Sequence, residues 1–199
     1  IEALPPLELP ALNFSLSDKE KDVFADKQHK AWDKSQEARC DFQFNLRLTR
    51  RSDVNFTSIW QKSILGRTLT EIKADDAMIP FFANEIVPTI KDTIGHNLSS
   101  GNWCICTSPK RRHTTRNFAT LISMQIADLL NIPFYEDVAF CRSKHRVGAK
   151  FDLNILPKEP NVIVYDDFVT TGQTLRAMKD LLLAHNKNLA FFTGVNNKL

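Results

Sequence analysis

Two adjacent aspartates at the end of a short apolar run constrain this sequence most. Residues 162–165 read Val-Ile-Val-Tyr, Asp166 and Asp167 follow them, and Gly172 stands a short way downstream. An unbroken apolar run of this length predicts a buried strand, and the apolar spacing from about 174 to 185 predicts a helix. A buried strand that leads through a polar turn into a helix is typical of α/β proteins.

The turn between this strand and helix is suited to binding phosphate. Backbone N–H groups at a helix N-terminus bind anions with the help of the helix dipole, and a glycine there can adopt positive φ. In open α/β sheets, ligands bind at the carboxyl ends of the strands. The residues that we expect to bind phosphate are Thr170, Thr171, Gly172, Gln173 and Thr174.

Asp166 and Asp167 call for a partner other than phosphate, because two carboxylates repel that anion. Ribose hydroxyls donate hydrogen bonds, and ionised carboxylates accept them. The same two side chains are suitable ligands for Mg²⁺, which we expect as the cofactor. A phosphate on the helix end and a sugar on the acids together describe a ribose 5-phosphate.

The second half of the chain continues this alternation of strands and helices. Apolar runs predict further strands at 103–107, 138–142 and 189–194, and a helix is predicted after residue 117. We therefore expect an α/β fold with a parallel, Rossmann-like sheet and right-handed crossovers. We assign this core to residues 101–199.

Residues 1–100 contain several different patterns. The proline-rich start predicts an extended arm, and a Ser17/Glu20 capping box predicts a helix over 18–38. Alternation over 40–49 predicts a half-buried strand that carries four apolar side chains on one face. These side chains are Phe42, Phe44, Leu46 and Leu48.

A helical region is predicted between residue 68 and Ile94. Thr68 and Glu71 form a second capping box, which marks its start. Pro80 and Pro88 interrupt it, and each proline should start or kink a helix rather than sit in its middle.

The net charge of +3 is too small to indicate nucleic acid by itself, but the basic residues form two clusters. Such clusters suit a small polyanionic ligand, although solvated loop faces are the alternative. The first contains Lys110, Arg111, Arg112, His113 and Arg116, and the second contains Arg142, Lys144, His145, Arg146 and Lys150.

The four cysteines form no C-x-x-C pair, so we expect reduced, buried thiols and no zinc site. No apolar run has the length of a membrane span, and the first residues show no signal-peptide pattern. We therefore expect a cytoplasmic protein with no membrane partner.

The segment 162–174 resembles the phosphoribosyl pyrophosphate motif of the type I phosphoribosyltransferases, a hydrophobic run followed by two acids and T-T-G-x-T. The resemblance implies that Asp166 and Asp167 hold the ribose hydroxyls and take part in catalysis, and that 170–174 hold the 5-phosphate. It also implies that 1–100 supply a hood over the acceptor base.

The resemblance further implies a pyrophosphate-binding loop after 103–107, formed by Ser108, Lys110, Arg111, Arg112 and Arg116. Residues 142–151 occupy the place of a flexible loop that closes over the substrate. The catalytic residue Arg146 would then place its positive charge beside the departing pyrophosphate. An ordinary exposed connection is the alternative for this segment.

A narrower resemblance is to the ComF-like branch of the family, which tends to show R-x-x-x-R-G-F-N after the first core strand. This chain has a similar segment at 112–118, with Asn117 in place of the glycine. The cysteine-rich zinc ribbon that begins many members of the branch is absent from the sequence.

Two functions follow from these patterns. The first is a phosphoribosyltransferase of nucleotide metabolism, whose acceptor base no motif identifies. The second is a non-catalytic module that senses phosphoribosyl pyrophosphate or a nucleotide and regulates a protein or nucleic-acid partner, as in a competence or defence system. Residues 1–100 would then contact the partner, and a homodimer is common in the family.

Overall fold

The computed structural model of the chain describes residues 38–109, 117–141 and 151–197, all within one compact unit, Gln36–Leu199. The strands are β1 (Arg39–Cys40), β2 (Arg47–Arg51), β3 (Val54–Gln61), β4 (Arg67–Thr68), β5 (Trp103–Thr107), β6 (Phe134–Tyr135), β7 (Ala139–Cys141), β8 (Phe151–Leu153), β9 (Asn161–Val169) and β10 (Asn188–Asn196). The helices are α2 (Leu69–Ala74), α3 (Met78–Ile94), the 3₁₀ helix η1 (Gly95–Ser100), α4 (Phe118–Leu130) and α5 (Gln173–Leu183).

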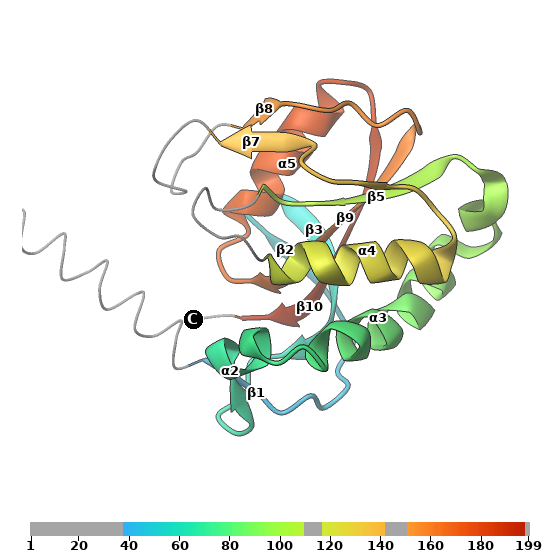
Figure 1. Ribbon diagram of the computed structural model, residues 1–199. Helices are drawn as coiled ribbons and strands as arrows, with labels where there is room; N and C mark the ends of the chain where they lie inside the picture. Colours follow the sequence, from blue (N-terminus) through green and yellow to red (C-terminus); the bar gives the residue numbers. More distant parts are fainter. Residues whose placement is uncertain (1–37, 110–116, 142–150, 198–199) are drawn as a thin grey trace, which may run out of the picture. The chain divides into compact units, whose positions relative to one another are not determined.

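A six-stranded sheet in the order β2-β3-β10-β9-β5-β6 forms the centre of this unit (Figure 1). All neighbouring strands in it run parallel except β2, which pairs antiparallel with β3 at one edge. The predicted α/β fold with a parallel sheet is therefore confirmed. Because β2 and β3 precede residue 101, the sheet takes strands from both predicted segments, and the division into 1–100 and 101–199 stays a prediction.

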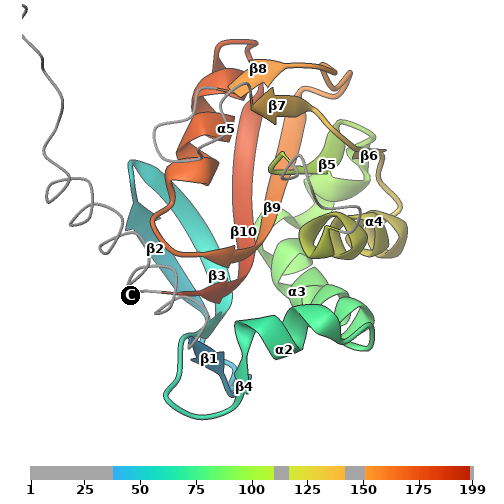
Figure 2. The same cartoon turned by 60° about the vertical axis from the view of Figure 1, so that its left-hand side comes forward.

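Helices cover both faces of the sheet (Figure 2). On one face, α3 and α4 pack in a cluster that contains Phe82, Ile122 and Ile163. On the other face, α5 packs through Leu175 and Met178. Helix α4 leads from β5 to β6 at one edge of the sheet, and α5 leads from β9 to β10 toward the other edge. The order in which strands are added to the sheet therefore reverses between β5 and β9. Ligands bind at such a switch point in open α/β sheets.

The prediction of one half-buried strand over 40–49 is wrong. Residues 41–46 lie outside any strand, and Phe42 adopts a positive φ of 57°. Phe44, Leu46 and Leu48 are 63%, 50% and 76% exposed. Leu48 stands opposite Thr57 on the edge strand β2, at the margin of the face that α3 and α4 cover. An alternating pattern predicts which side chains share one face of a strand, but it does not show that other elements of the protein cover that face.

The prolines of α3 behave differently from each other. Pro80 lies in the first turn of the helix, as predicted, where the missing N–H has no cost. Pro88 lies inside the helix and starts none, so for this residue only the kink stays a prediction. Pro88 and Asn84 are both exposed, so water can satisfy the Asn84 carbonyl that loses its intrahelical partner.

The predicted strand at 138–142 is present as β7, but it does not join the parallel sheet. It pairs antiparallel with β8, and the two-residue strand β6 lies next to β5 instead. The predicted burial of the thiols is confirmed for Cys40, Cys104 and Cys106. Within 38–109, 117–141 and 151–197, no helix combines the length and apolar character that crossing a membrane requires.

Candidate functional site

Asp166 and Asp167 lie within β9. The sequence pattern had instead suggested that the strand ends before them. The pairing of β9 with β10 continues past the acids, with Thr193 opposite Asp166 and Val195 opposite Phe168. The backbone of both acids is therefore fixed by the sheet. Successive residues of a strand point to opposite faces, so the two carboxylates have different surroundings.

The Asp166 carboxylate meets the end of the neighbouring strand β5. Thr107 and Tyr165 are opposite each other in the parallel pair, and Ser108 Oγ donates a hydrogen bond of 3.3 Å to Asp166 Oδ2. This contact joins the first residue of the predicted pyrophosphate loop to the first of the two acids. It lies at the switch point between β5 and β9.

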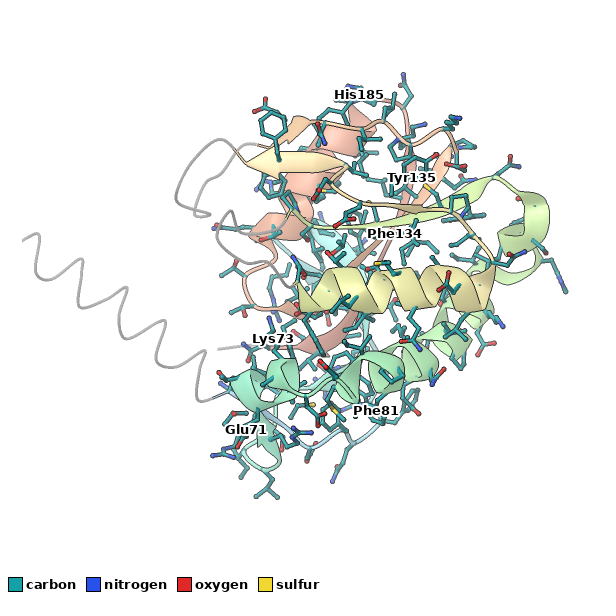
Figure 3. All side chains as sticks on the ribbon, in the orientation of Figure 1. Glu71, Lys73, Phe81, Phe134, Tyr135 and His185 are labelled. Carbon is teal, nitrogen blue, oxygen red and sulfur yellow. The ribbon has the colours of Figure 1, made fainter. Side chains whose placement is uncertain are left out.

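The Asp167 carboxylate is 9% exposed and pairs with a lysine from the first half of the chain. Lys73 Nζ lies 3.0 Å from Asp167 Oδ2, and the Phe168 N–H donates to Asp167 Oδ1 at 2.8 Å. The Lys73 ammonium also lies 4.8 Å from the centroid of the Phe168 ring. A carboxylate this buried needs such a counter-charge. Figure 3 labels Lys73 on α2.

The short helix α2 holds Lys73 in place. Its start is the predicted capping box, in which Thr68 Oγ1 accepts from the Glu71 N–H and Glu71 Oε2 accepts from the Thr68 N–H. These hydrogen bonds from Thr68 lower the pKa of Glu71. After the helix, Asp75 Oδ2 accepts from Arg67 Nη1 at 2.8 Å, which ties the end of α2 to the strand before it.

The predicted phosphate loop connects β9 to α5. Gly172 is the N-cap of α5 with φ 78°, which confirms the expected left-handed glycine. A Cβ at this position would lie 3.1 Å from the Arg51 carbonyl oxygen, so both the positive φ and this close contact disfavour a larger residue. Asn197 Nδ2 donates to Thr170 Oγ1 at 3.1 Å and orients that hydroxyl.

The sequence prediction missed the residues that support this loop from the β2–β3 turn. Arg51 donates hydrogen bonds to the carbonyl oxygens of Val169 and Thr170, and Ser52 donates to that of Thr171. No local pattern marks these contacts, since the partners of Arg51 are 118 and 119 residues away along the chain. Lys73 was missed for the same reason.

Tyr165, the residue before the two acids in β9, is fully buried, and its phenol stays protonated. Burial raises its pKa well above the ordinary value, and the negative charges of Asp167 and Asp166 raise it further. A phenol in this setting does not act as a base near neutral pH.

The other predicted cationic residues, Lys110, Arg111, Arg112, Arg116 and Arg146, lie outside the described residues. Within the part of the chain that the structure describes, no group of three or more His, Cys, Asp or Glu side chains could hold a metal ion. Two carboxylates nevertheless fit Mg²⁺ that arrives with a ligand, because this ion takes one or two protein carboxylates and completes its shell with phosphate oxygens and water.

Scans against protein-family models and against curated proteins give no match. Among solved structures, the chain is similar to adenine phosphoribosyltransferase from Saccharomyces cerevisiae, with 14% identity, 84% of this chain and 89% of that chain covered, and a TM-score of 0.45. Another adenine phosphoribosyltransferase gives 14% identity, coverage of 83% and 89%, and a TM-score of 0.48. A hypoxanthine-guanine phosphoribosyltransferase from Bacillus anthracis gives 15% identity, coverage of 63% of this chain and 79% of that chain, and a TM-score of 0.44. Values this low assign neither an activity nor a substrate to the present chain.

Proposed function

We propose that this chain is a phosphoribosyltransferase that transfers ribose 5-phosphate from phosphoribosyl pyrophosphate to a nitrogenous base. The observation that carries the proposal is the junction at the switch point. There the end of β5 meets the acids of β9 through Ser108 and Asp166, and a left-handed Gly172 opens the adjoining helix. Together these elements offer groups for a pyrophosphate, a sugar and a phosphate side by side.

Each part of the site has a role in this proposal. The loop 170–174 binds the 5-phosphate through backbone N–H groups and hydroxyls. Asp166 and Asp167 accept hydrogen bonds from the ribose hydroxyls. Ser108, with Lys110, Arg111, Arg112 and Arg116 beyond it, binds the pyrophosphate, and Arg146 approaches it as it leaves.

The reaction itself needs no covalent bond to the protein. The bond between ribose C1 and the pyrophosphate oxygen breaks, and its electron pair leaves with pyrophosphate. The lone pair of the acceptor nitrogen forms the new bond to C1, and that nitrogen releases its proton. The two carboxylates stabilise the positive charge that develops on the sugar, so catalysis rests on positioning and electrostatics. Mg²⁺, held by Asp166 and Asp167, would supply charge neutralisation of the pyrophosphate.

In this proposal the hood over the acceptor comes from residues 1–100, the segment that also contributes β2 and β3 to the central sheet. The protein works in the cytoplasm. The Lys73–Asp167 pair supports a shared site, because it brings a side chain from this segment to the acids. A protein partner that binds through the same segment belongs to the sensor alternative.

The test is pyrophosphate release in the presence of phosphoribosyl pyrophosphate, Mg²⁺ and single purine and pyrimidine bases. We expect release with at least one base, and its loss in Asp166→Asn. Asp180→Asn is the matched control, because Asp180 is an exposed acid on α5 whose side chain is 67% exposed. Binding without turnover for any base would replace the transferase by the sensor.

A further inference from the structure

We infer that Arg51 is a positioning residue that holds the phosphate loop in its binding conformation by fixing the carbonyl groups on the side away from the ligand. The inference rests on the proposed function, because it concerns the same loop. It adds to the site a residue from the antiparallel edge of the sheet, which no part of the phosphate motif contains.

The contacts of Arg51 and Ser52 reach three successive carbonyl groups. Arg51 Nη1 donates to Val169 O at 3.2 Å and to Thr170 O at 2.5 Å. The next residue, Ser52, donates from Oγ to Thr171 O at 2.6 Å. Arg51, the last residue of β2, and Ser52, the first residue of the turn after it, thus hold every carbonyl between the end of β9 and Gly172.

Fixing these carbonyls also fixes the N–H groups of the loop. In a trans peptide, the carbonyl of one residue and the N–H of the next point in opposite directions. With three carbonyls turned toward the β2–β3 turn, the N–H groups of Thr170, Thr171 and Gly172 are directed to the opposite side. Successive N–H groups that face one side can bind an anion together, and holding them in this arrangement before the ligand arrives reduces the entropic cost of binding.

The guanidinium is itself held rigidly. Its Nη2 donates to Asn196 Oδ1 at 2.7 Å, and the amide of Asn196 donates to Gln61 Oε1 at 2.8 Å, which sets the direction in which Asn196 presents its oxygen. The Phe56 ring lies 5.8 Å from the guanidinium carbon. A planar fork with five N–H donors can serve these separate acceptors together, and a lysine ammonium of similar charge cannot.

The position of Gly172 depends on the same residue. Its missing Cβ leaves room for the Arg51 backbone, because a Cβ there would lie 3.1 Å from the Arg51 oxygen and 3.3 Å from its Cβ. The left-handed glycine and the Arg51 side chain therefore act on one loop from adjacent points. Loss of the hydrogen bonds from the Arg51 guanidinium would allow the loop carbonyls to turn and would weaken phosphate binding.

Calorimetric titration of ribose 5-phosphate into the full chain tests this inference, with Arg51→Lys and Ser52→Ala as variants. We expect Arg51→Lys to raise the Kd about tenfold, the effect of one lost charge-assisted hydrogen bond, and Ser52→Ala to raise it less. Arg50→Lys is the matched control, because Arg50 is the neighbouring arginine with a side chain that is 72% exposed and pairs with Asp53. Its Kd should stay at the wild-type value.

A second readout separates positioning from general stability. The amide N–H resonance of Gly172 should shift on adding ribose 5-phosphate to the wild type, and the same shift should be reduced in Arg51→Lys at a temperature where both are folded. A lower Tm for Arg51→Lys with an unchanged Kd and an unchanged Gly172 shift would overturn the inference and leave a structural role. Absence of any binding to the wild type would instead contradict the proposed function.

Discussion

Lys73 Nζ lies 3.0 Å from Asp167 Oδ2, and this ion pair joins helix α2 to the central strand β9. The carboxylate is 9% exposed and the lysine side chain 46% exposed. The acid is therefore charge-compensated by its own chain before any ligand arrives. A sugar hydroxyl or a cation that uses Asp167 has to share the carboxylate with Lys73 or displace it.

Replacing Lys73 should make the site more dependent on Mg²⁺. Lys73→Met keeps an apolar stem against Phe168 but leaves the Asp167 carboxylate without this counter-charge. We expect the variant to lose about 1 kcal/mol of stability without Mg²⁺, because the lysine is partly solvated. Millimolar Mg²⁺ should raise its Tm more than that of the wild type in thermal melts. Lys179→Met, which removes a lysine paired with Asp53, is the control, and an equal effect of Mg²⁺ on all three proteins would contradict the prediction.

Gly172→Ala should affect both folding and phosphate binding. An L-residue at φ 78° costs about 1 kcal/mol, and its Cβ would also press on the Arg51 backbone. Gly101→Ala is a matched control, since Gly101 has φ 74° and open space around its missing Cβ. Both variants should lose Tm, Gly172→Ala more so because of its contact with Arg51, but only Gly172→Ala should lose affinity for ribose 5-phosphate. Equal affinities would show that the loop does not bind the phosphate.

Gly194→Ala should test how closely α3 approaches β10, the strand that pairs with β9 beside the acids. A Cβ on Gly194 would lie 2.6 Å from the Phe82 ring and 3.1 Å from the Asp167 carbonyl oxygen. Overpacking of this kind costs about 1–3 kcal/mol in chemical unfolding. Adding Phe82→Leu should give a double variant that is more stable than the sum of the two single losses, because it removes the ring that the new methyl group meets. A double variant no more stable than the sum of the two single effects would contradict the contact.

The buried thiols should make the protein less stable in alkali. Burial raises the pKa of Cys40 to about 11 and, with the nearby Glu159 charge, that of Cys104 to about 12, from an ordinary value of 9.0. Above that ordinary value the unfolded thiols lose protons that the folded thiols keep, so each thiol lowers the free energy of unfolding by about 1.4 kcal/mol per pH unit until its folded pKa is reached. Urea titrations between pH 8 and 11 measure the slope, which Cys104→Ala should reduce. A slope that this variant leaves unchanged would count against the burial of Cys104.

Local patterns were sufficient for several elements that follow residue 101. The strand at 103–107, the helix after residue 117 and the left-handed Gly172 are all confirmed, because each depends on neighbours along the sequence. The extent of β9 was underestimated, since two acids look like the end of a strand until the partner strand β10 continues beside them.

The remaining features depend on contacts between distant residues. Leu48 follows an alternating pattern but is exposed at the sheet edge, and nothing local distinguishes an edge strand from a central one. Arg51 and Lys73 are a basic turn residue and a helical lysine in the sequence, and only the fold brings them to the loop and to Asp167. The strand that carries the acids and the left-handed glycine after it were therefore predictable, and the residues that support them were not.

The central claim is that the acids of β9 and the loop after them bind phosphoribosyl pyrophosphate. Isothermal titration of this compound with Mg²⁺ into the wild type and into the double variant Asp166→Asn/Asp167→Asn tests it most directly. We predict micromolar binding to the wild type and its loss in the double variant, with both proteins folded by circular dichroism. Equal binding to the two proteins, or no binding to the folded wild type in the presence of Mg²⁺, would contradict the claim.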